Sequence, residues 1–105
     1  MKRGTTPILP VEHDLDLGVV KSVEFLFKQK KTEYAPAIAI KTYPGEVSER
    51  DGVFHIPFSE EETRRFTENA DFYCDPKITL VDDSIPATEI MTLHCNPTLW
   101  GERDD

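Results

Sequence analysis

The chain has 105 residues, of which 38% are hydrophobic and 30% charged, so it fits one ordinary folded domain with a single core. Twenty acidic residues against 12 basic ones give a formal net charge of −8, which argues against binding to nucleic acid or to an anionic membrane surface. No apolar stretch approaches the ~20 residues that span a bilayer, and none follows Lys2 and Arg3 as it would in a signal peptide.

The chain as a whole predicts short strands, because eight prolines and five glycines favour sharp turns over a helical bundle. Residues 6–17 predict an edge strand that is broken near Pro10, since proline cannot donate a hydrogen bond to a neighbouring strand. Residues 20–29 show the clearest strand pattern, in which Leu26 breaks the alternation and marks a partly covered position. The residues expected to face the core there are Val23, Phe25 and Phe27.

Two further strands are predicted on either side of an exposed, charged segment. Residues 34–43 carry Ile38 and Ile40 at alternating positions, so we expect both isoleucines to point inward. An Asp-Gly turn then precedes an alternating run over residues 53–58, and this pattern is typical of a hairpin.

Residues 59–66 predict one short helix. Ser59 and Glu62 have the spacing of a capping box, in which the serine hydroxyl accepts the Glu62 amide and the carboxylate accepts the Ser59 amide. Acidic residues fill the first turn and two arginines the last, as the helix dipole favours. Phe66 is expected to anchor this helix to the core.

The last two strands are expected over residues 72–81 and 88–95, and the alternation leaves open which side of the second one faces inward. If this hairpin turns near Ser84, Cys74 and Cys95 lie almost opposite each other on neighbouring strands of one sheet. That geometry is poor for a disulfide, so we expect two buried thiols.

Six or seven short strands, with one helix before the penultimate strand, predict an all-β fold. The expected architecture is an immunoglobulin-like sandwich of two sheets, and a small barrel is the alternative. We expect a single domain over residues 1–105, with frayed tails at about residues 1–5 and 101–105.

No pattern of reactive residues predicts an enzyme. The histidines His13, His55 and His94 are expected to be exposed, and no Gly-x-Ser-x-Gly turn supplies a nucleophile. A zinc site would have to combine His94 and Cys95, which point to opposite faces of a strand, with Cys74 and His55. We therefore expect no catalytic, metal or cofactor site, and a thiol- or metal-dependent enzyme is only a third hypothesis.

Four short motifs follow one another along residues 3–93. They are Arg3-Gly4-Thr5-Thr6-Pro7, Phe27-Lys28-Gln29, Phe58-Ser59-x-Glu61-Glu62-Thr63 with Phe66, and Ala87-Thr88-Glu89-Ile90. This order resembles a family of small immunoglobulin-like proteins encoded in the tail-morphogenesis regions of phages and prophages of Gram-positive bacteria. The resemblance implies a structural protein of the virion or its tail, with no catalytic residues to carry over. The two cysteines and the ending at residues 96–100 depart from the family pattern.

The resemblance and the lack of a chemical motif lead us to expect a non-enzymatic accessory protein of a phage or prophage particle, associated with the tail or baseplate. It would be made in the bacterial cytoplasm and enter the virion, where it docks on other tail proteins or on further copies of itself. The contact would use a sheet face, an edge strand or the tail around Trp100.

The residues expected at this contact are the exposed aromatics Tyr34, Tyr43, Tyr73 and Trp100. An alternative function is a module that binds host carbohydrate through the same aromatic side chains. The basic run Lys28-Gln29-Lys30-Lys31 is expected to be a solvated turn and not a nucleic-acid contact.

Overall fold

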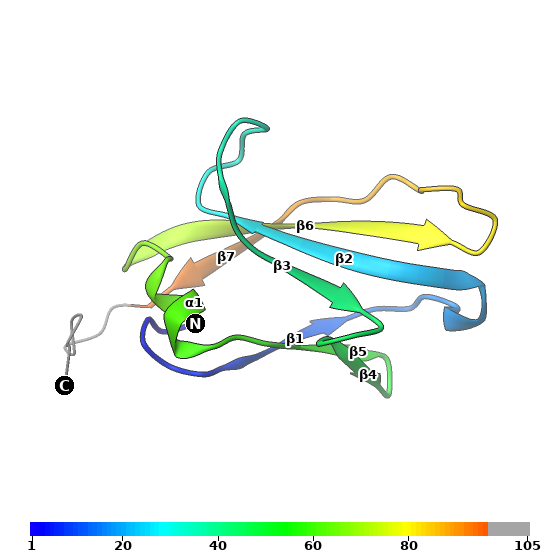
Figure 1. The fold of residues 1–105 in the computed structure, drawn as a ribbon, viewed down its shortest axis with the longest axis horizontal. Helices are drawn as coiled ribbons and strands as arrows, with labels where there is room; N and C mark the ends of the chain where they lie inside the picture. Colours follow the sequence, from blue (N-terminus) through cyan, green and yellow to red (C-terminus); the bar gives the residue numbers. More distant parts are fainter. Residues whose placement is uncertain (97–105) are drawn as a thin grey trace.

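The computed structural model describes residues 1–96, which fold into two antiparallel sheets packed face to face (Figure 1). Seven strands and one short α-helix within this range confirm the predicted all-β sandwich. The first sheet contains, in spatial order, β1 (Ile8–Glu12), β5 (Val53–Pro57) and β4 (Ser48–Arg50). The second contains β3 (Ala37–Tyr43), β2 (Val20–Lys28), β6 (Ala70–Leu80) and β7 (Met91–Cys95). The helices are α1 (Glu60–Arg64) and the short 3₁₀ turn η1 (Leu17–Val19).

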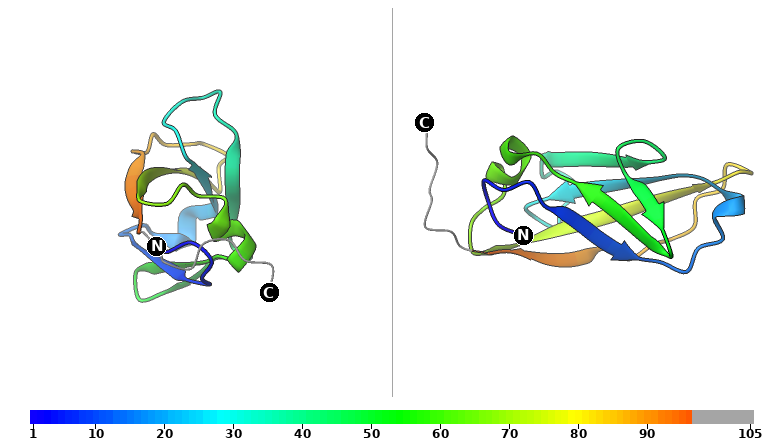
Figure 2. Two further views of the ribbon diagram at one scale, coloured as in Figure 1. Left: turned by 90° about the vertical axis from the view of Figure 1, so that its left-hand side faces the viewer. Right: turned by 90° about the horizontal axis from the view of Figure 1, so that it is seen from below.

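The connections follow the immunoglobulin arrangement. The hairpins β2–β3, β4–β5 and β6–β7 each stay within one sheet, and the other three connections cross between the sheets (Figure 2). The order β1-β5-β4 against β3-β2-β6-β7 corresponds to strands B-E-D against C′-C-F-G, with no counterpart of strand A in residues 1–96. As predicted, α1 lies in the crossing that leads to the penultimate strand.

The hairpin between β4 and β5 is closed by the predicted Asp-Gly turn. Asp51 and Gly52 both have positive φ, 54° and 77°. A type I′ turn needs this conformation at both central residues, and its twist matches that of the strands it joins. The Gly52 carbonyl also accepts the His13 amide at 2.9 Å, so the turn is tied to the end of β1.

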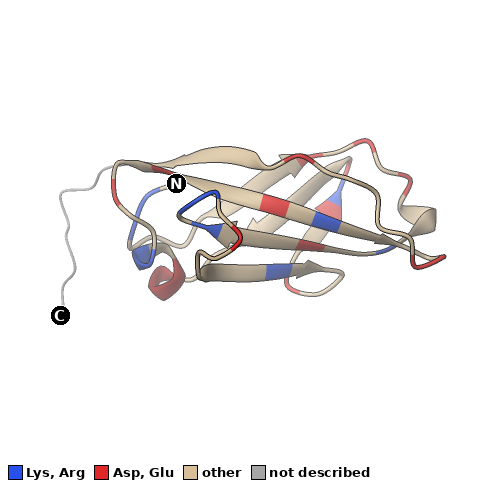
Figure 3. Ribbon diagram, turned by 90° about the horizontal axis from the view of Figure 1, so that it is seen from above, with Lys and Arg blue, Asp and Glu red and all other residues tan. Residues whose placement is uncertain are grey.

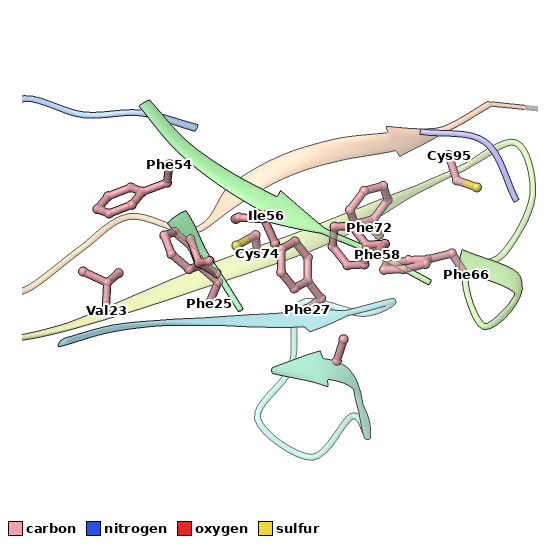
Figure 4. Packing of buried hydrophobic residues seen from close by; sticks show 12 residues of the cluster. Val23, Phe25, Phe27, Phe54, Ile56, Phe58, Phe66, Phe72, Cys74 and Cys95 are labelled. Carbon is pink, nitrogen blue, oxygen red and sulfur yellow. The ribbon is translucent and has the colours of Figure 1, made fainter. Parts of the chain in front are cut away.

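The core lies between the two sheets and is rich in phenylalanine (Figure 4). The predicted inward residues of β2 are all buried, and Phe27 contacts the ring of Phe58 from the opposite layer at a centroid distance of 4.9 Å. Phe66 follows α1 and packs against Phe72 of β6 at 4.5 Å, so the helix is anchored as expected. The buried apolar residues are Val23, Phe25, Phe27, Ala39, Val47, Phe54, Ile56, Phe58, Phe66, Phe72, Cys74 and Cys95.

The inward face of β3 differs from the prediction. Ile40 is 55% exposed, whereas Ala39 and Lys41 are buried. Ala39 lies directly opposite Phe27 of β2, and residues opposite each other in an antiparallel pair share a face. The pairing register therefore turns Ile40 outward, and the small Ala39 fills the place beside the phenylalanine rings. Ile38, which shares the parity of Ile40, is only partly buried against the core.

The capping box of α1 forms as the sequence predicts. The Ser59 hydroxyl accepts the Glu62 amide at 3.1 Å, and the Glu62 carboxylate accepts the Ser59 amide at 2.8 Å. Thr63 is fully buried and its hydroxyl donates to the carbonyl of Thr5 at 2.9 Å. The helix is thus fixed at its start and along the face that packs on the N-terminal segment.

The first residues are tied to the body of the domain, although a frayed tail was expected over residues 1–5. The Met1 carbonyl accepts the Asn96 amide at 2.6 Å, and the Met1 amine donates to the carbonyl of His94 at 3.2 Å. Arg3 donates to the carbonyl of Arg64 at 2.8 Å. These bonds place the N-terminal segment beside β7. The other expected tail, residues 101–105, lies outside the described residues.

Candidate functional site

A hollow of about 360 Å³ opens on the outer face of the four-stranded sheet. Its floor is apolar, because Leu26 of β2 and Tyr73 of β6 point away from the core here, and Ile90 borders them just before β7. Ile90 is 41% exposed, and an aliphatic side chain so placed is available to a partner. In the sequence, Leu26 is marked by its break in the alternation, and Tyr73 is among the aromatics predicted to be exposed.

The connection between β2 and β3, residues 29–36, forms the rim of this hollow. Lys28 Nζ donates to the carbonyls of Thr32 and Glu33 at 3.3 and 3.0 Å, so it holds the connection in place. Gln29 joins the base of the connection to its neighbours by donating to the Asp71 carbonyl at 2.7 Å and accepting the Thr67 amide at 2.6 Å. The rim is therefore held in place by hydrogen bonds within the domain.

The rim is locally basic in an acidic protein. Lys28, Lys30 and Lys31 border the hollow together with two carboxylates, Glu33 and Asp75. Figure 3 shows this face, with lysines gathered on the connection and on the adjoining end of β2. Because Lys28 is engaged with carbonyls, Lys30 and Lys31 are the exposed cations that can meet an anionic group.

A second hollow of about 510 Å³ lies on the other side of the same connection. Tyr34 borders it and is 91% exposed, and Ile38 and Arg65 complete its wall. The connection 29–36 thus stands between two hollows, each with one tyrosine and at least one cation. Both hollows combine apolar and basic side chains at this end of the sheet.

The edge of β3 is blocked against further strand pairing. Its outward backbone groups include the amide of Thr42, which donates to the Glu46 side chain at 2.9 Å, and the carbonyl of Thr42, which accepts the Val47 amide at 3.2 Å. Arg65 donates to the carbonyl of Ile38 at 3.4 Å. A strand added here would have to displace these bonds, which is how natural sheets avoid edge-to-edge association.

The remaining sheet edges of the described chain carry other obstacles. The end of β7 is bonded to Met1, and Pro10 in the middle of the edge strand β1 has no amide hydrogen to offer. The strand β4 has only three residues. These edges therefore offer few free backbone groups for the addition of a further strand.

The four aromatic residues predicted as partner contacts do not gather on one surface. Tyr73 and Tyr34 border the two hollows on either side of the 29–36 connection. Tyr43 is partly buried and packs against Phe54 of the core at a centroid distance of 5.2 Å. Trp100 lies outside the described residues.

The environment of His13 differs from the expected exposed position. Its side chain is 8% exposed, stacks on Phe54 at 4.2 Å and lies 2.8 Å from Glu49. Because the Leu15 amide donates to His13 Nδ1 at 3.1 Å, the proton sits on Nε2 and is donated to Glu49. This histidine links β4 to the segment after β1 and has a structural role. The alternation pattern did not identify His13 as a buried residue, because His13 follows strand β1 and does not lie within it.

The other predicted metal candidates remain apart. His94 is exposed and lies 3.0 Å from Asp71, while the adjacent Cys95 is buried on the opposite face of β7. His55 lies in the other sheet, on β5. Within residues 1–96, no three His, Cys, Asp or Glu side chains converge as a metal site requires.

The cysteines are free and buried, as predicted, but they are not opposite each other. Cys74 pairs with Met91, and Cys95 pairs with Ala70. The hairpin turns between Leu80 and Ser84, so its centre comes before Ser84, where the sequence predicted it. The residue opposite Cys74 is therefore Met91, four positions before Cys95. Burial, aided by the charge of Asp75, raises the pKa of Cys74 to about 12, so this thiol is not a nucleophile at neutral pH.

A scan against protein-family models found no family that matches this chain, and searches of curated proteins and of solved structures found no match either. None of the helices in the described part of the chain has the length and apolar character to cross a membrane.

Proposed function

We propose that this chain is a non-enzymatic docking module of a phage or prophage particle, associated with its tail or baseplate. Its partner is another protein of the particle, which binds on the outer face of the sheet β3-β2-β6-β7. The setting in a virion rests on the resemblance of the motifs along residues 3–93. The mode of action rests on the surface of the domain.

The observation that carries the docking role is the hollow beside Tyr73, because it is already formed and lies on a face that the domain leaves open. Its apolar floor and lysine rim offer both burial and charge to a partner. The blocked edges of β1, β3 and β7 leave few backbone groups for strand addition, so the side chains of this face supply the contact.

Incorporation into particles tests this proposal. Tagged wild-type chain is expressed in the strain that carries its gene, and particles are purified by density gradient. The wild type is expected in the tail fraction, and K30E/K31E is expected to be largely lost from it. The variant K2E/R50E makes the same change in net charge away from the hollow and should be retained. Absence of the wild-type chain from purified particles would overturn the proposal.

A second candidate function, binding of host carbohydrate, is supported by the place of Tyr73 on the hollow next to Thr32. An aromatic face beside a hydroxyl group suits a sugar ring. A glycan array distinguishes the two functions, because sugar binding would be lost in Tyr73→Ala and would survive in K30E/K31E. An array without any signal would reject the carbohydrate function.

A further inference from the structure

We propose that the hollow also receives the turn at residues 81–85 of a second copy of this chain, so that copies join head to tail. This inference rests on the docking role proposed for the hollow and names one occupant for it. The occupant is chosen because the turn and the hollow offer complementary groups.

The turn presents acidic and aliphatic side chains together. Asp82 and Asp83 stand at its tip, and Val81 and Ile85 on either side are 62% and 55% exposed. The turn therefore offers two aliphatic side chains and two carboxylates on one short segment. Nothing within residues 1–96 covers them.

The hollow supplies the counterpart of each group. Its floor of Leu26, Tyr73 and Ile90 can bury an aliphatic side chain, and Lys30 and Lys31 can meet two carboxylates. Its own acids, Glu33 and Asp75, are outnumbered by the three lysines around it. Because the aliphatic side chains of the turn match the apolar floor and its carboxylates match the lysines, we assign this turn as the occupant of the hollow.

The turn holds its shape before any contact. The amide of Leu80 donates to the carbonyl of Ser84 and the amide of Asp83 donates to the carbonyl of Leu80, both at 2.9 Å. The hydroxyl and amide of Ser84 both donate to Asp82, and these bonds lower the pKa of that carboxyl, which is charged at neutral pH. A turn ordered in advance loses little conformational freedom when it docks.

The charges around the turn favour the same arrangement. Lys21 lies 2.9 Å from Asp83, but both side chains are mostly exposed, so this ion pair is weak and can be exchanged. The nearby 3₁₀ turn η1, whose Val19 carbonyl accepts the Val81 amide at 2.9 Å, is preceded by Asp14 and Asp16. The end of the molecule that would enter the hollow is therefore acidic.

The connection at residues 29–36, which borders the hollow, and the turn at residues 81–85 lie toward opposite ends of the four-stranded sheet (Figures 1 and 3). A contact between two different surfaces leaves one turn and one hollow unoccupied, so copies add in series as a ring or an open fibre. Copies could also join in series by pairing of strand edges, but the edges of β1, β3 and β7 are blocked. The joint is expected to be weak and salt-dependent because it is small and charged.

Two charge-reversed variants test this joint by sedimentation velocity. K30E/K31E reverses the rim of the hollow, and D82K/D83K reverses the turn. At ~0.01 M ionic strength, where charges act over ~30 Å, the wild type is expected to associate increasingly up to ~1 mM protein. Each variant alone should associate about tenfold less, since like charges then face each other.

The decisive sample is the equal mixture of the two variants. In this mixture each turn can meet a hollow of opposite charge, so association should return to the wild-type level, and 1 M salt should abolish it. Far-ultraviolet circular dichroism checks that each variant is folded. If D82K/D83K is unfolded, Asp83→Lys alone is used, because it keeps the bonds between Asp82 and Ser84.

The control variants K2E/R50E and E12K/E61K make the same changes in net charge elsewhere and should associate as the wild type does. A wild-type chain that stays monomeric at all concentrations and at low salt would overturn the head-to-tail joint, as would a mixture that associates no more than its components. If K30E/K31E were nevertheless lost from particles, docking of another protein in the hollow would stand and only self-association would fall.

Discussion

Lys41 Nζ lies 2.7 Å from Glu62 Oε1, and this contact ties β3 to the helix that crosses between the sheets. The same oxygen accepts the Ser59 amide, so one carboxylate closes the helix cap and fixes the neighbouring sheet. The Lys41 ammonium also lies 5.3 Å from the centre of the Phe58 ring. These partners explain how a lysine occupies a buried position of β3.

Removal of either charge should destabilise the fold. Lys41→Ala leaves the poorly exposed Glu62 without its main partner, and we expect the free energy of unfolding to fall by about 1–3 kcal/mol. Glu62→Gln should cost a similar amount. Urea unfolding of both single variants and the double variant measures their coupling. Strictly additive effects would show that the two side chains do not act together.

The same contact makes stability depend on pH. Burial alone would raise the pKa of Glu62, but hydrogen bonds from Lys41 and Ser59 outweigh it and lower that pKa below the ordinary value of 4.5. Because this pKa is lower in the folded than in the unfolded chain, the ionised Glu62 contributes its full stabilisation above the unfolded pKa. That contribution is lost as the pH falls through the folded pKa. The stability difference between wild type and Glu62→Gln should therefore shrink below pH 4.5. A difference that grew on acidification would contradict this.

The reversed face of β3 is tested by substitution at two adjacent residues. Ala39→Leu would overpack the space beside Phe27 and should lower stability by about 1–3 kcal/mol. Ile40→Thr changes a mostly exposed side chain and should shift stability by less than about 0.5 kcal/mol. Thermal unfolding measures the change in stability of each variant. A larger loss in Ile40→Thr than in Ala39→Leu would instead support the inward-facing isoleucines that the sequence predicts.

Neither thiol should react with a labelling reagent in the folded protein. Burial raises the pKa of both Cys74 and Cys95, and a thiolate is the species that reacts. Ellman's reagent at about pH 8 should therefore label neither cysteine in native protein within minutes and both in denaturant. Fast labelling of Cys74 in the native state would show that β6 opens readily and would contradict this prediction.

The sequence predicted the elements that depend on local chemistry. The capping box at Ser59, the Asp-Gly turn and the alternation of β2 each involve neighbours along the chain, and each is found as expected. Pairing between strands depends on where a turn closes, and the turn at Leu80 to Ser84 shifted the expected partner of Cys74 by four residues.

The candidate site was harder to predict, because its parts come from separate segments. Leu26 and the lysine run were visible in the sequence, one as a broken alternation and the other as a solvated turn. Only the pairing of β2 with β6 brings Tyr73 next to them, and the hydrogen bonds of Lys28 and Gln29 hold the connection beside the floor. The hollow is therefore a product of tertiary structure.

Site-directed photo-cross-linking tests the central claim, that the outer face of β3-β2-β6-β7 docks a protein partner. Benzoylphenylalanine replaces Lys31 at the hollow or, as a control, Arg50 on the other sheet, and purified particles are irradiated and analysed by mass spectrometry. We predict adducts from position 31 to a second virion protein or to another copy of this chain, and none from position 50. Adducts from position 50 alone would contradict the claim.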